Sequence, residues 1–359
     1  SILELLLGLK EKYKLSILFI SHDLMVVSQI ADEVSVMYQG KIIESGSKDA
    51  VLNNPVSDYA KGLLACKPRL DKKPYRLPTV SDFLQNTKPA SSSPKKQLER
   101  EEDLQPLLTV SDLTVVYPGR KREEDVTAVK NVSFEVFKGE TLGLVGESGC
   151  GKTSIGRALL QLINEKSGII EYKGNAINTI SEKKFRSLRR ELQIVFQDPY
   201  SSLNPRQTIG SILVEPLIIH QLVEGKKERN AECIRLLEQV GLPSASLNKY
   251  PHQFSGGQRQ RIGIARALAC QPEFIVLDES VSALDVSVQA QVINLLNDLK
   301  ESLNLTYLFI SHDLTVVKYV SDRIIVMSEG IIVEQGDAEQ IYLNPANSYT
   351  RKLIEAIPR

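Results

Sequence analysis

The chain repeats its first 69 residues at its far end. Sliding the sequence by 290 positions aligns residues 1–69 with residues 291–359 without a gap, and about 28 of the 69 positions are identical. The heptapeptide LFISHDL, for example, occurs at 18–24 and again at 308–314. A match of this length without gaps indicates two copies of one structural unit. The fold of the last 69 residues is therefore also the fold expected for the first 69.

The second copy follows a long segment that the first copy lacks. Residues 107–290 have no counterpart before residue 1. The simplest interpretation is that residues 1–66 are the C-terminal fragment of a first domain, whose front part lay upstream in a longer protein. The alternative is a partial duplication that folds by itself, but an isolated strand, helix and hairpin cannot close a core. We therefore expect residues 1–69 to be poorly ordered or to pair along an exposed sheet edge.

The segment between the two copies has the composition of a connector. Residues 67–106 contain six prolines, three consecutive serines and charges of both signs, with few large apolar side chains. Such a composition is typical of a flexible or partly extended linker. We expect it to join two domains that lie side by side.

The overall composition excludes several classes of protein. The 359 residues include 44 Lys and Arg against 44 Asp and Glu, so the net charge gives no reason to expect nucleic acid as a partner. No apolar window approaches the length of a membrane span, and the first residues do not resemble a signal peptide. The four cysteines form no CxxC pair, which argues against a zinc knuckle or a disulfide framework. We expect a soluble, intracellular α/β protein.

From Leu107 onward, short β-rich runs alternate with helical stretches, as in a fold with a buried parallel sheet. The pattern predicts a strand over 141–145, a helix over 153–163 and an all-helical insert near 207–250. Between that strand and that helix lies the sequence GESGCGKTS. A strand, this glycine loop and a helix are the context that the motif G-x-x-x-x-G-K-[ST] requires.

A loop of this kind binds phosphate groups. Its glycines let successive backbone N–H groups point inward, and the helix N-terminus adds a positive dipole end. Lys152 is placed to reach the β- and γ-phosphates of a nucleotide, and Thr153 offers a hydroxyl to Mg²⁺. The predicted nucleotide-binding residues of the loop are Gly146, Glu147, Ser148, Gly149, Cys150, Gly151, Lys152, Thr153 and Ser154.

Two carboxylates follow a second apolar strand, which spans 274–277. Ligands of open α/β sheets bind where the strands end, and Asp278 and Glu279 come directly after this one. Asp278 is the expected Mg²⁺ ligand, and Glu279 is the expected group that polarises the attacking water. The acid pair alone is a weak signal, and its value lies in its place behind the glycine loop.

The sequence FSGGQ at 254–258, followed by RQRIGIARAL, resembles the signature motif of ABC-type ATPases. The resemblance covers 107–359 and implies a P-loop NTPase of ABC type over 107–335. Such a domain has a parallel-sheet core, an antiparallel β subdomain and a helical subdomain, here at about 198–256. It binds ATP with Mg²⁺ between the glycine loop of one domain and the signature loop of a second ATPase domain. The signature residues are Ser255, Gly256, Gly257 and Gln258.

The same resemblance implies roles for further residues. Gln197 would sense Mg²⁺ and the attacking water, and His312 would bind the γ-phosphate and orient Glu279. His312 recurs as His22, the corresponding residue of the first domain. The aromatic ring of Tyr117 would stack on adenine, although an ordinary strand-end tyrosine is an equal alternative. Asp285, in SALD at 282–285, would couple two sites.

Two further motifs resemble the oligopeptide/dipeptide (and nickel) importer ATPases. They are QDPYSSLNPR at 197–206 and NPANSYTR at 344–351, which recurs as NPVSDY at 54–59. Two such domains in one chain resemble the fused peptide- or glutathione-import ATPases, with residues 336–359 as the importer extension. Some relatives carry a cluster of cysteines in their C-terminal extension. In this chain only Cys66 lies near the corresponding region, so no iron–sulfur site is expected.

An importer of this family implies partners. They are separate membrane permease subunits, which dock on the helical insert at the cytoplasmic face of the membrane, and, indirectly, an extracytoplasmic solute-binding protein. The alternative is a soluble ABC ATPase of translation or DNA repair. Against it stand the absence of zinc-ligand cysteines and the short spacing, about 58 residues, between Gln197 and Ser255. A third possibility is a nucleotide-binding module without turnover, which the intact Glu279 and His312 disfavour.

Overall fold

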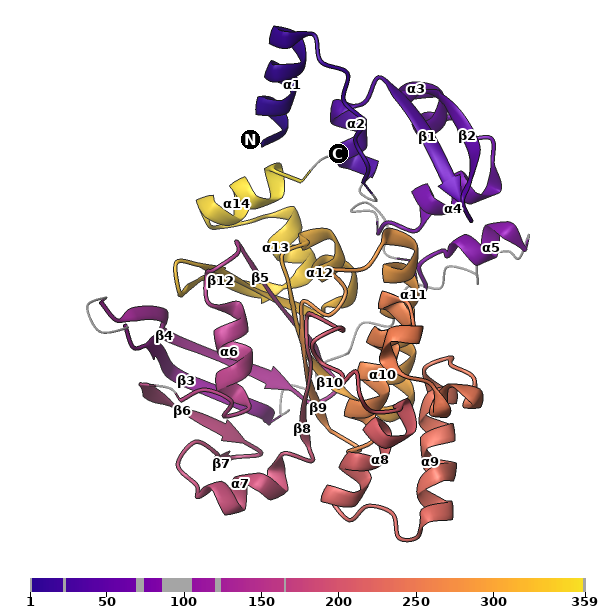
Figure 1. The fold of residues 1–359 in the computed structure, drawn as a ribbon. Coiled ribbons are helices and arrows are strands. Elements are labelled where there is room, and N and C mark those ends of the chain that lie inside the picture. The colour runs from indigo at the N-terminus through magenta and orange to yellow at the C-terminus, as the bar shows by residue number, and fades with distance from the viewer. Residues whose placement is uncertain are drawn as a thin grey trace. The chain divides into compact units, whose positions relative to one another are not determined.

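The chain forms two compact units, which are described separately. In the computed structural model (Figure 1), the first unit comprises residues 1–95 and 285–294 and the second comprises 96–284 and 295–357. The division differs from the predicted boundaries, because 285–294 groups with the first unit. The structure describes residues 2–21, 24–68, 74–85, 105–119, 124–164 and 166–357.

The centre of the second unit is a six-stranded sheet in the order β12-β11-β5-β10-β9-β8. Five of its strands run parallel and β12 is antiparallel to β11, as the sequence pattern predicts for an α/β core. All six residues of β5 are buried. The strands are β5 (Thr141–Gly146), β8 (Leu192–Val195), β9 (Phe274–Asp278), β10 (Thr306–Ser311), β11 (Arg323–Ser328) and β12 (Ile331–Asp337).

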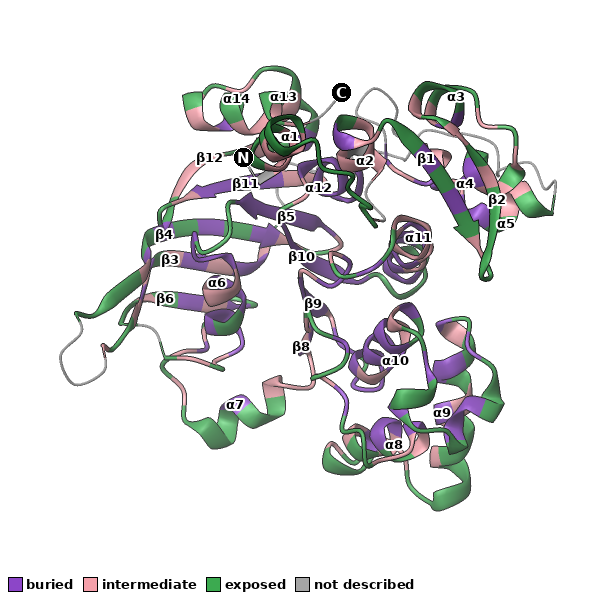
Figure 2. Ribbon diagram, turned by 45° about the horizontal axis from the view of Figure 1, so that its top comes forward, coloured by how far each residue is buried: buried purple, intermediate pink, exposed green. Residues whose placement is uncertain are grey.

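A four-stranded antiparallel sheet in the order β4-β3-β6-β7 forms a second layer. Helix α6 (Lys152–Leu159) packs against both sheets (Figure 2). Its Ile155 and Leu159 belong to a core cluster with residues of both sheets. The helix is shorter than predicted from the sequence, because Gln161 adopts a left-handed φ of 48° and the helix ends before it. The strands are β3 (Pro106–Tyr117), β4 (Val126–Phe137), β6 (Ser167–Tyr172) and β7 (Asn175–Ala176).

Helices make up the rest of the second unit. The predicted helical insert contains α8 (Ile209–Ile219) and α9 (Lys226–Gln239), which pack against each other and against α10. No helix in the described part of the chain is long and apolar enough to cross a membrane. The remaining helices are α7 (Glu182–Leu188), α10 (Gly256–Leu268), α11 (Val286–Leu303, shared with the first unit), α12 (Leu314–Val320), α13 (Ala338–Leu343) and α14 (Ser348–Glu355).

The sequence repeat is also a structural repeat. In the first unit, the hairpin β1–β2 has the register of β11–β12, with the same bulge after Val36 as after Val326. The helices after each hairpin also correspond. A small core of Val34, Val36, Val51 and Ala60 holds the first copy together. The elements of this unit are α1 (Ile2–Tyr13), α2 (Leu24–Ile30), β1 (Glu33–Tyr38), β2 (Lys41–Ser47), α3 (Lys48–Asn53), α4 (Asp58–Ala65) and α5 (Val80–Leu84).

The repeated LFIS sequence takes different structures in the two copies. In the second copy it forms part of β10, and Leu308 and Ile310 are fully buried. In the first copy the same residues form no strand, and Leu18 and Ile20 are 90% and 88% exposed. The described part of the first unit contains no counterparts of β5 and β9 to pair with this sequence. The segment that follows is regular, since residues 24–65 form helices and a hairpin. The poor order expected for residues 1–69 stays a prediction.

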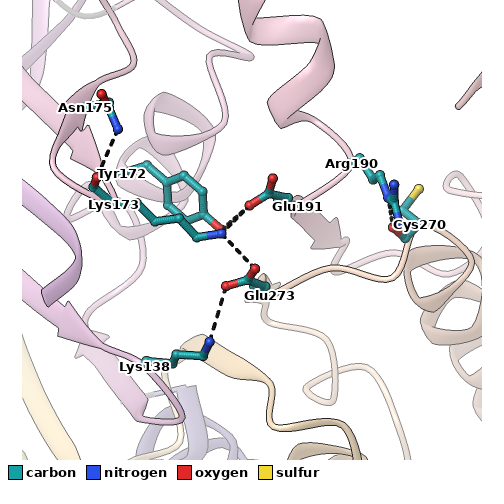
Figure 3. Close-up of polar contacts among 8 residues, drawn as sticks. All are labelled: Lys138, Tyr172, Lys173, Asn175, Arg190, Glu191, Cys270 and Glu273. Carbon is teal, nitrogen blue, oxygen red and sulfur yellow. Dashed lines mark hydrogen bonds and ion pairs between the residues drawn. The ribbon is translucent and has the colours of Figure 1, made fainter.

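A charged cluster fixes the end of the sheet at which β8 and β9 begin (Figure 3). Lys173 lies in the β6–β7 turn, and its Nζ is 2.7 Å from carboxylate oxygens of both Glu191 and Glu273. The hydroxyl of Tyr172 donates to Glu191, and Lys138 lies 3.8 Å from Glu273. The two glutamates immediately precede β8 and β9. The cluster therefore fastens the antiparallel sheet to two strands whose other ends carry predicted site residues.

We expect Lys173→Met to lower the free energy of unfolding by about 1–2 kcal/mol, since these partly exposed groups are screened by water. Burial raises the pKa of Glu191, but hydrogen bonds from Lys173 and Tyr172 outweigh it and leave this pKa below its ordinary value. The stabilisation is thus present above about pH 4.5 and is lost as the pH falls further. Urea unfolding at pH 7 and pH 4 should show a larger difference between wild type and variant at pH 7.

The matched control is Lys138→Met, whose ammonium makes a longer contact with one carboxylate only. It should change the free energy of unfolding less than Lys173→Met does. An equal effect of the two substitutions at pH 7 would contradict the role given to Lys173.

Candidate nucleotide-binding site

The glycine loop lies between β5 and α6, as the sequence predicts. Gly151 precedes the helix with φ of 104°, and a Cβ atom there would lie 2.3 Å from the carbonyl oxygen of Ala128 on β4. Lys152 is buried, and its Nζ donates to the carbonyl oxygens of Gly146 at 2.9 Å and Glu147 at 2.8 Å. The loop thus curls around an ammonium group, which stands where phosphate charge would be neutralised.

Thr153 and Asp278 meet beside the loop. The Thr153 hydroxyl donates to a carboxylate oxygen of Asp278 at 2.9 Å, and this acid is buried at the end of β9. Burial raises the pKa of Asp278, while the hydrogen bond from Thr153 opposes that rise. In the described part of the chain, no three His, Cys, Asp or Glu side chains form a metal cage. The two oxygen ligands suit Mg²⁺, which is usually held by one or two side chains together with phosphates and water.

Glu279 is the meeting point of three chain segments. Gln197, which follows β8, donates through Nε2 to Glu279 Oε2 at 2.8 Å. His312, which follows β10, places Nδ1 3.5 Å from the same oxygen. The backbone of Glu279 adopts a left-handed φ of 44°, and its amide donates to the carbonyl of Ile310 at 3.0 Å. A non-glycine residue in this conformation is strained, and such strain is typical of functional sites.

Tyr117 is the last residue of β3 and lies close to the start of α6. Its hydroxyl lies 3.1 Å from the hydroxyl of Ser154, and the side chain is partly exposed. This contact brings the tyrosine to the edge of the loop. Stacking on adenine stays a prediction.

The signature residues form the start of α10. Ser255 is the N-cap, and its hydroxyl accepts from the amide of Gln258 at 3.4 Å while the Gln258 side chain accepts from the Ser255 amide at 3.1 Å. This reciprocal pair is a capping box, and Gly256 and Gly257 are the first helical residues. Contact of this segment with a nucleotide stays a prediction.

Asp285, the residue predicted to couple two sites, caps another helix. The Asp285 carboxylate accepts from the Val288 amide at 3.0 Å and from the Ser287 hydroxyl at 2.6 Å, at the first turn of α11. Its coupling role stays a prediction. His22 lies outside the described residues. The carbonyl of Ala128 is a further part of the site that carries no side-chain signal, so no sequence motif could have revealed it.

The fold and the site together define an ATP-binding domain of the ABC class. Residues 129–282 match the family model described as ABC transporter. Residues 43–97 and 333–359 match the model of the oligopeptide/dipeptide transporter C-terminal region. Residues 129–282 therefore form an ABC transporter domain, and each repeat contains a segment that matches the oligopeptide/dipeptide transporter C-terminal region.

Proteins of known function resemble the chain over almost its whole length. The glutathione import ATP-binding protein GsiA of Escherichia coli K12 is 46% identical over 99% of this chain and 58% of its own length. The GsiA protein of Shigella flexneri gives the same figures. The chain thus spans less than two thirds of these relatives.

Solved ABC structures share the fold. A dimeric post-hydrolysis state of the ATP-binding cassette MJ0796 with ADP and Pi has a TM-score of 0.58 at 28% identity, covering 64% of this chain and 98% of that one. CbiO1 of Clostridium perfringens, part of an ABC transporter complex, has a TM-score of 0.58 at 25% identity, covering 71% and 96%. These likenesses confirm the predicted fold class.

Proposed function

We propose that the chain is part of the ATP-binding and hydrolysing subunit of an importer for peptides or related small solutes. It would act with separate membrane permease subunits at the cytoplasmic face of the membrane, and indirectly with an extracytoplasmic solute-binding protein. Two observations support this proposal: the oligopeptide/dipeptide C-terminal region in both repeats, and the similarity to GsiA proteins, named for glutathione import.

The single observation that carries the proposed activity is the convergence of Gln197 and His312 on Glu279, beside the Thr153–Asp278 pair. The Glu279 carboxylate can accept a proton from the water that attacks the γ-phosphate. Gln197 and His312 both contact Oε2 of this carboxylate and would fix its orientation. Bound Mg²⁺, held by Thr153, Gln197 and Asp278, would neutralise charge on the phosphates.

Lys152 would hold the β- and γ-phosphates from inside the loop. In the structure its ammonium donates to two loop carbonyls, and these contacts would be exchanged for phosphate oxygens when ATP enters. The exchange keeps the buried charge paired at each stage, which lowers the cost of binding.

A complete site would need a second ATPase domain. The chain contains one glycine loop and one signature motif, both within 107–335. In the ABC sandwich each nucleotide needs a loop from one domain and a signature from the other. We therefore expect two copies of this chain to pair before ATP is hydrolysed rapidly. The ATPase rate per mole of protein should rise with concentration, and a high, constant rate at nanomolar protein would contradict pairing.

The direct test is calorimetric titration of the chain with MgATP. Wild type should bind it, and Lys152→Ala should bind about 10- to 100-fold more weakly, as expected for the loss of a charge-assisted phosphate contact. Lys166→Ala, which removes a lysine outside the loop, is the control and should bind as wild type does. Equal binding by wild type and Lys152→Ala would overturn the site.

Transport is tested separately from ATP binding. Purification from membranes should recover the chain with hydrophobic permease subunits. Recovery with ribosomes or DNA instead would favour the soluble ABC ATPase of translation or DNA repair.

A further inference from the structure

The C-terminal extension reaches the glycine loop through one tyrosine. Tyr349 lies in the first turn of α14, and its hydroxyl oxygen is fully buried. The polar groups that face this hydroxyl are the backbone amide of Glu147, in the loop, and the side chain of Ser328, at the end of β11. Cys150, also in the loop, lies close enough to act on it electrostatically. A residue of the importer extension thus borders the phosphate-binding backbone.

Two successive clamps, each a side chain that accepts hydrogen bonds from the backbone, fix the position of Tyr349. The Glu334 carboxylate, on β12, accepts from the backbone amides of Ala346 at 2.7 Å and Asn347 at 3.1 Å. The Asn347 side chain then accepts from the Tyr349 amide at 2.8 Å and caps α14. Charge-assisted bonds to backbone groups are stronger than neutral ones. The extension is therefore fastened to the core sheet directly before the tyrosine.

The same clamp is built in the first copy. Glu44, which corresponds to Glu334, accepts from the amides of Val56 at 2.8 Å and Ser57 at 2.9 Å. The tyrosine that follows, Tyr59, packs against Tyr38, with ring centroids 4.4 Å apart. In the second copy Ser328 takes the place of this second ring. The clamp is thus common to both copies, whereas the small serine leaves a polar setting for the hydroxyl of Tyr349.

The glycine loop is tightly packed on this side. A Cβ atom on Gly146 would lie 2.2 Å from the carbonyl oxygen of Met327 and 2.8 Å from Cys150 Sγ. The start of the loop therefore lies directly against β11, with no room for a side chain at position 146. Tyr349 lies at the junction of these two segments, next to the Glu147 amide and the Ser328 side chain.

The Tyr349 hydroxyl has no well-aligned hydrogen-bond partner within the described residues. A buried polar group in this state is costly, and the cost is recovered when a partner aligns with it. Burial also raises the pKa of Tyr349, so its hydroxyl remains protonated and can donate. The phenol oxygen can accept from the Glu147 amide while its O–H donates to Ser328 Oγ.

We propose that Tyr349 is a positioning residue of the glycine loop, whose hydroxyl accepts from the Glu147 amide when the loop closes on the nucleotide phosphates. The hydrogen bond is completed only in the ATP-bound loop, so it strengthens MgATP binding without stabilising the nucleotide-free protein. The inference rests on the proposed binding of ATP and adds the importer extension to that site.

The experiment compares Tyr349→Phe with wild type in the full chain, by calorimetry with MgATP and by thermal unfolding with and without MgATP. Removing the hydroxyl should weaken MgATP binding about fivefold, the effect of one neutral hydrogen bond. The melting temperature without nucleotide should be unchanged or slightly higher, because an unpartnered buried hydroxyl is removed. The rise in melting temperature caused by MgATP should be smaller than in wild type.

The matched control is Tyr342→Phe, in the same extension. Its ring packs under the Lys318 ammonium, 4.0 Å from the ring centroid, and the substitution keeps that ring. This variant should bind MgATP as wild type does.

Two results would overturn the inference. One is MgATP binding by Tyr349→Phe within twofold of wild type. The other is weaker binding accompanied by a fall in the nucleotide-free melting temperature, which would make the hydroxyl an ordinary structural group. A failure of the proposed function is distinct, because wild type itself would then fail to bind MgATP.

Discussion

Glu279→Gln should lower the rate of ATP hydrolysis about 1,000-fold, the usual contribution of a positioned general base. The substitution keeps the size of the side chain. It also keeps an oxygen that can accept from Gln197 Nε2, which lies 2.8 Å from Glu279 Oε2 in the wild type. It removes the negative charge and the capacity to take up a proton from water. The lysine, threonine and aspartate that would hold the nucleotide are unchanged, so MgATP affinity should stay within about threefold of wild type.

Single-turnover hydrolysis and calorimetry on the same preparation separate the two quantities. Because the bound nucleotide is not consumed, an ATP-bound dimer of the variant should accumulate and be visible by size-exclusion chromatography. The control is Glu339→Gln, an exposed acid of the extension that pairs with Lys318, and it should leave the rate unchanged. Hydrolysis by Glu279→Gln at the wild-type rate would remove Glu279 from its role.

The core of this site was predictable because its parts are local in sequence. The glycine loop is defined by the strand before it and the helix after it, and Asp278 and Glu279 by the strand that delivers them. Parallel strands end at one edge of a sheet, so the convergence of Gln197 and His312 on Glu279 follows from the topology once the strands are recognised.

What the sequence could not predict depends on distant neighbours. The identical LFIS sequence forms a buried strand at 308–311 and an exposed, irregular segment at 18–21, since only the second copy has β5 and β9 beside it. Local propensity is the same in both copies, and pairing partners decide the outcome. The approach of Tyr349 to Glu147 is of the same kind, because about 200 residues separate them in the chain.

The packing of the loop against the antiparallel sheet leads to the second large effect. Gly151→Ala should lower the free energy of unfolding by about 2–5 kcal/mol, from a left-handed backbone strain of about 1–2 kcal/mol and an overpacking cost of about 1–3 kcal/mol. Both costs are present because Gly151 has φ of 104° and its Cβ would lie 2.3 Å from the Ala128 carbonyl oxygen. The nearest atom is a backbone carbonyl oxygen on β4, not the far end of a flexible side chain that could move aside.

The same substitution should reduce MgATP binding more than Lys152→Ala does. Losing the lysine removes one contact, whereas shifting Gly151 misdirects several backbone N–H groups and the start of α6 at once. Gly149→Ala separates the two causes, because Gly149 has φ of 83° but nothing lies within 4 Å of its Cβ position. In urea, the free energy of unfolding of Gly149→Ala should therefore be about 1–2 kcal/mol below that of the wild type, and that of Gly151→Ala should be lower still. If the two variants unfold alike, the contact with Ala128 does not hold the loop in place, and backbone strain alone accounts for the glycine.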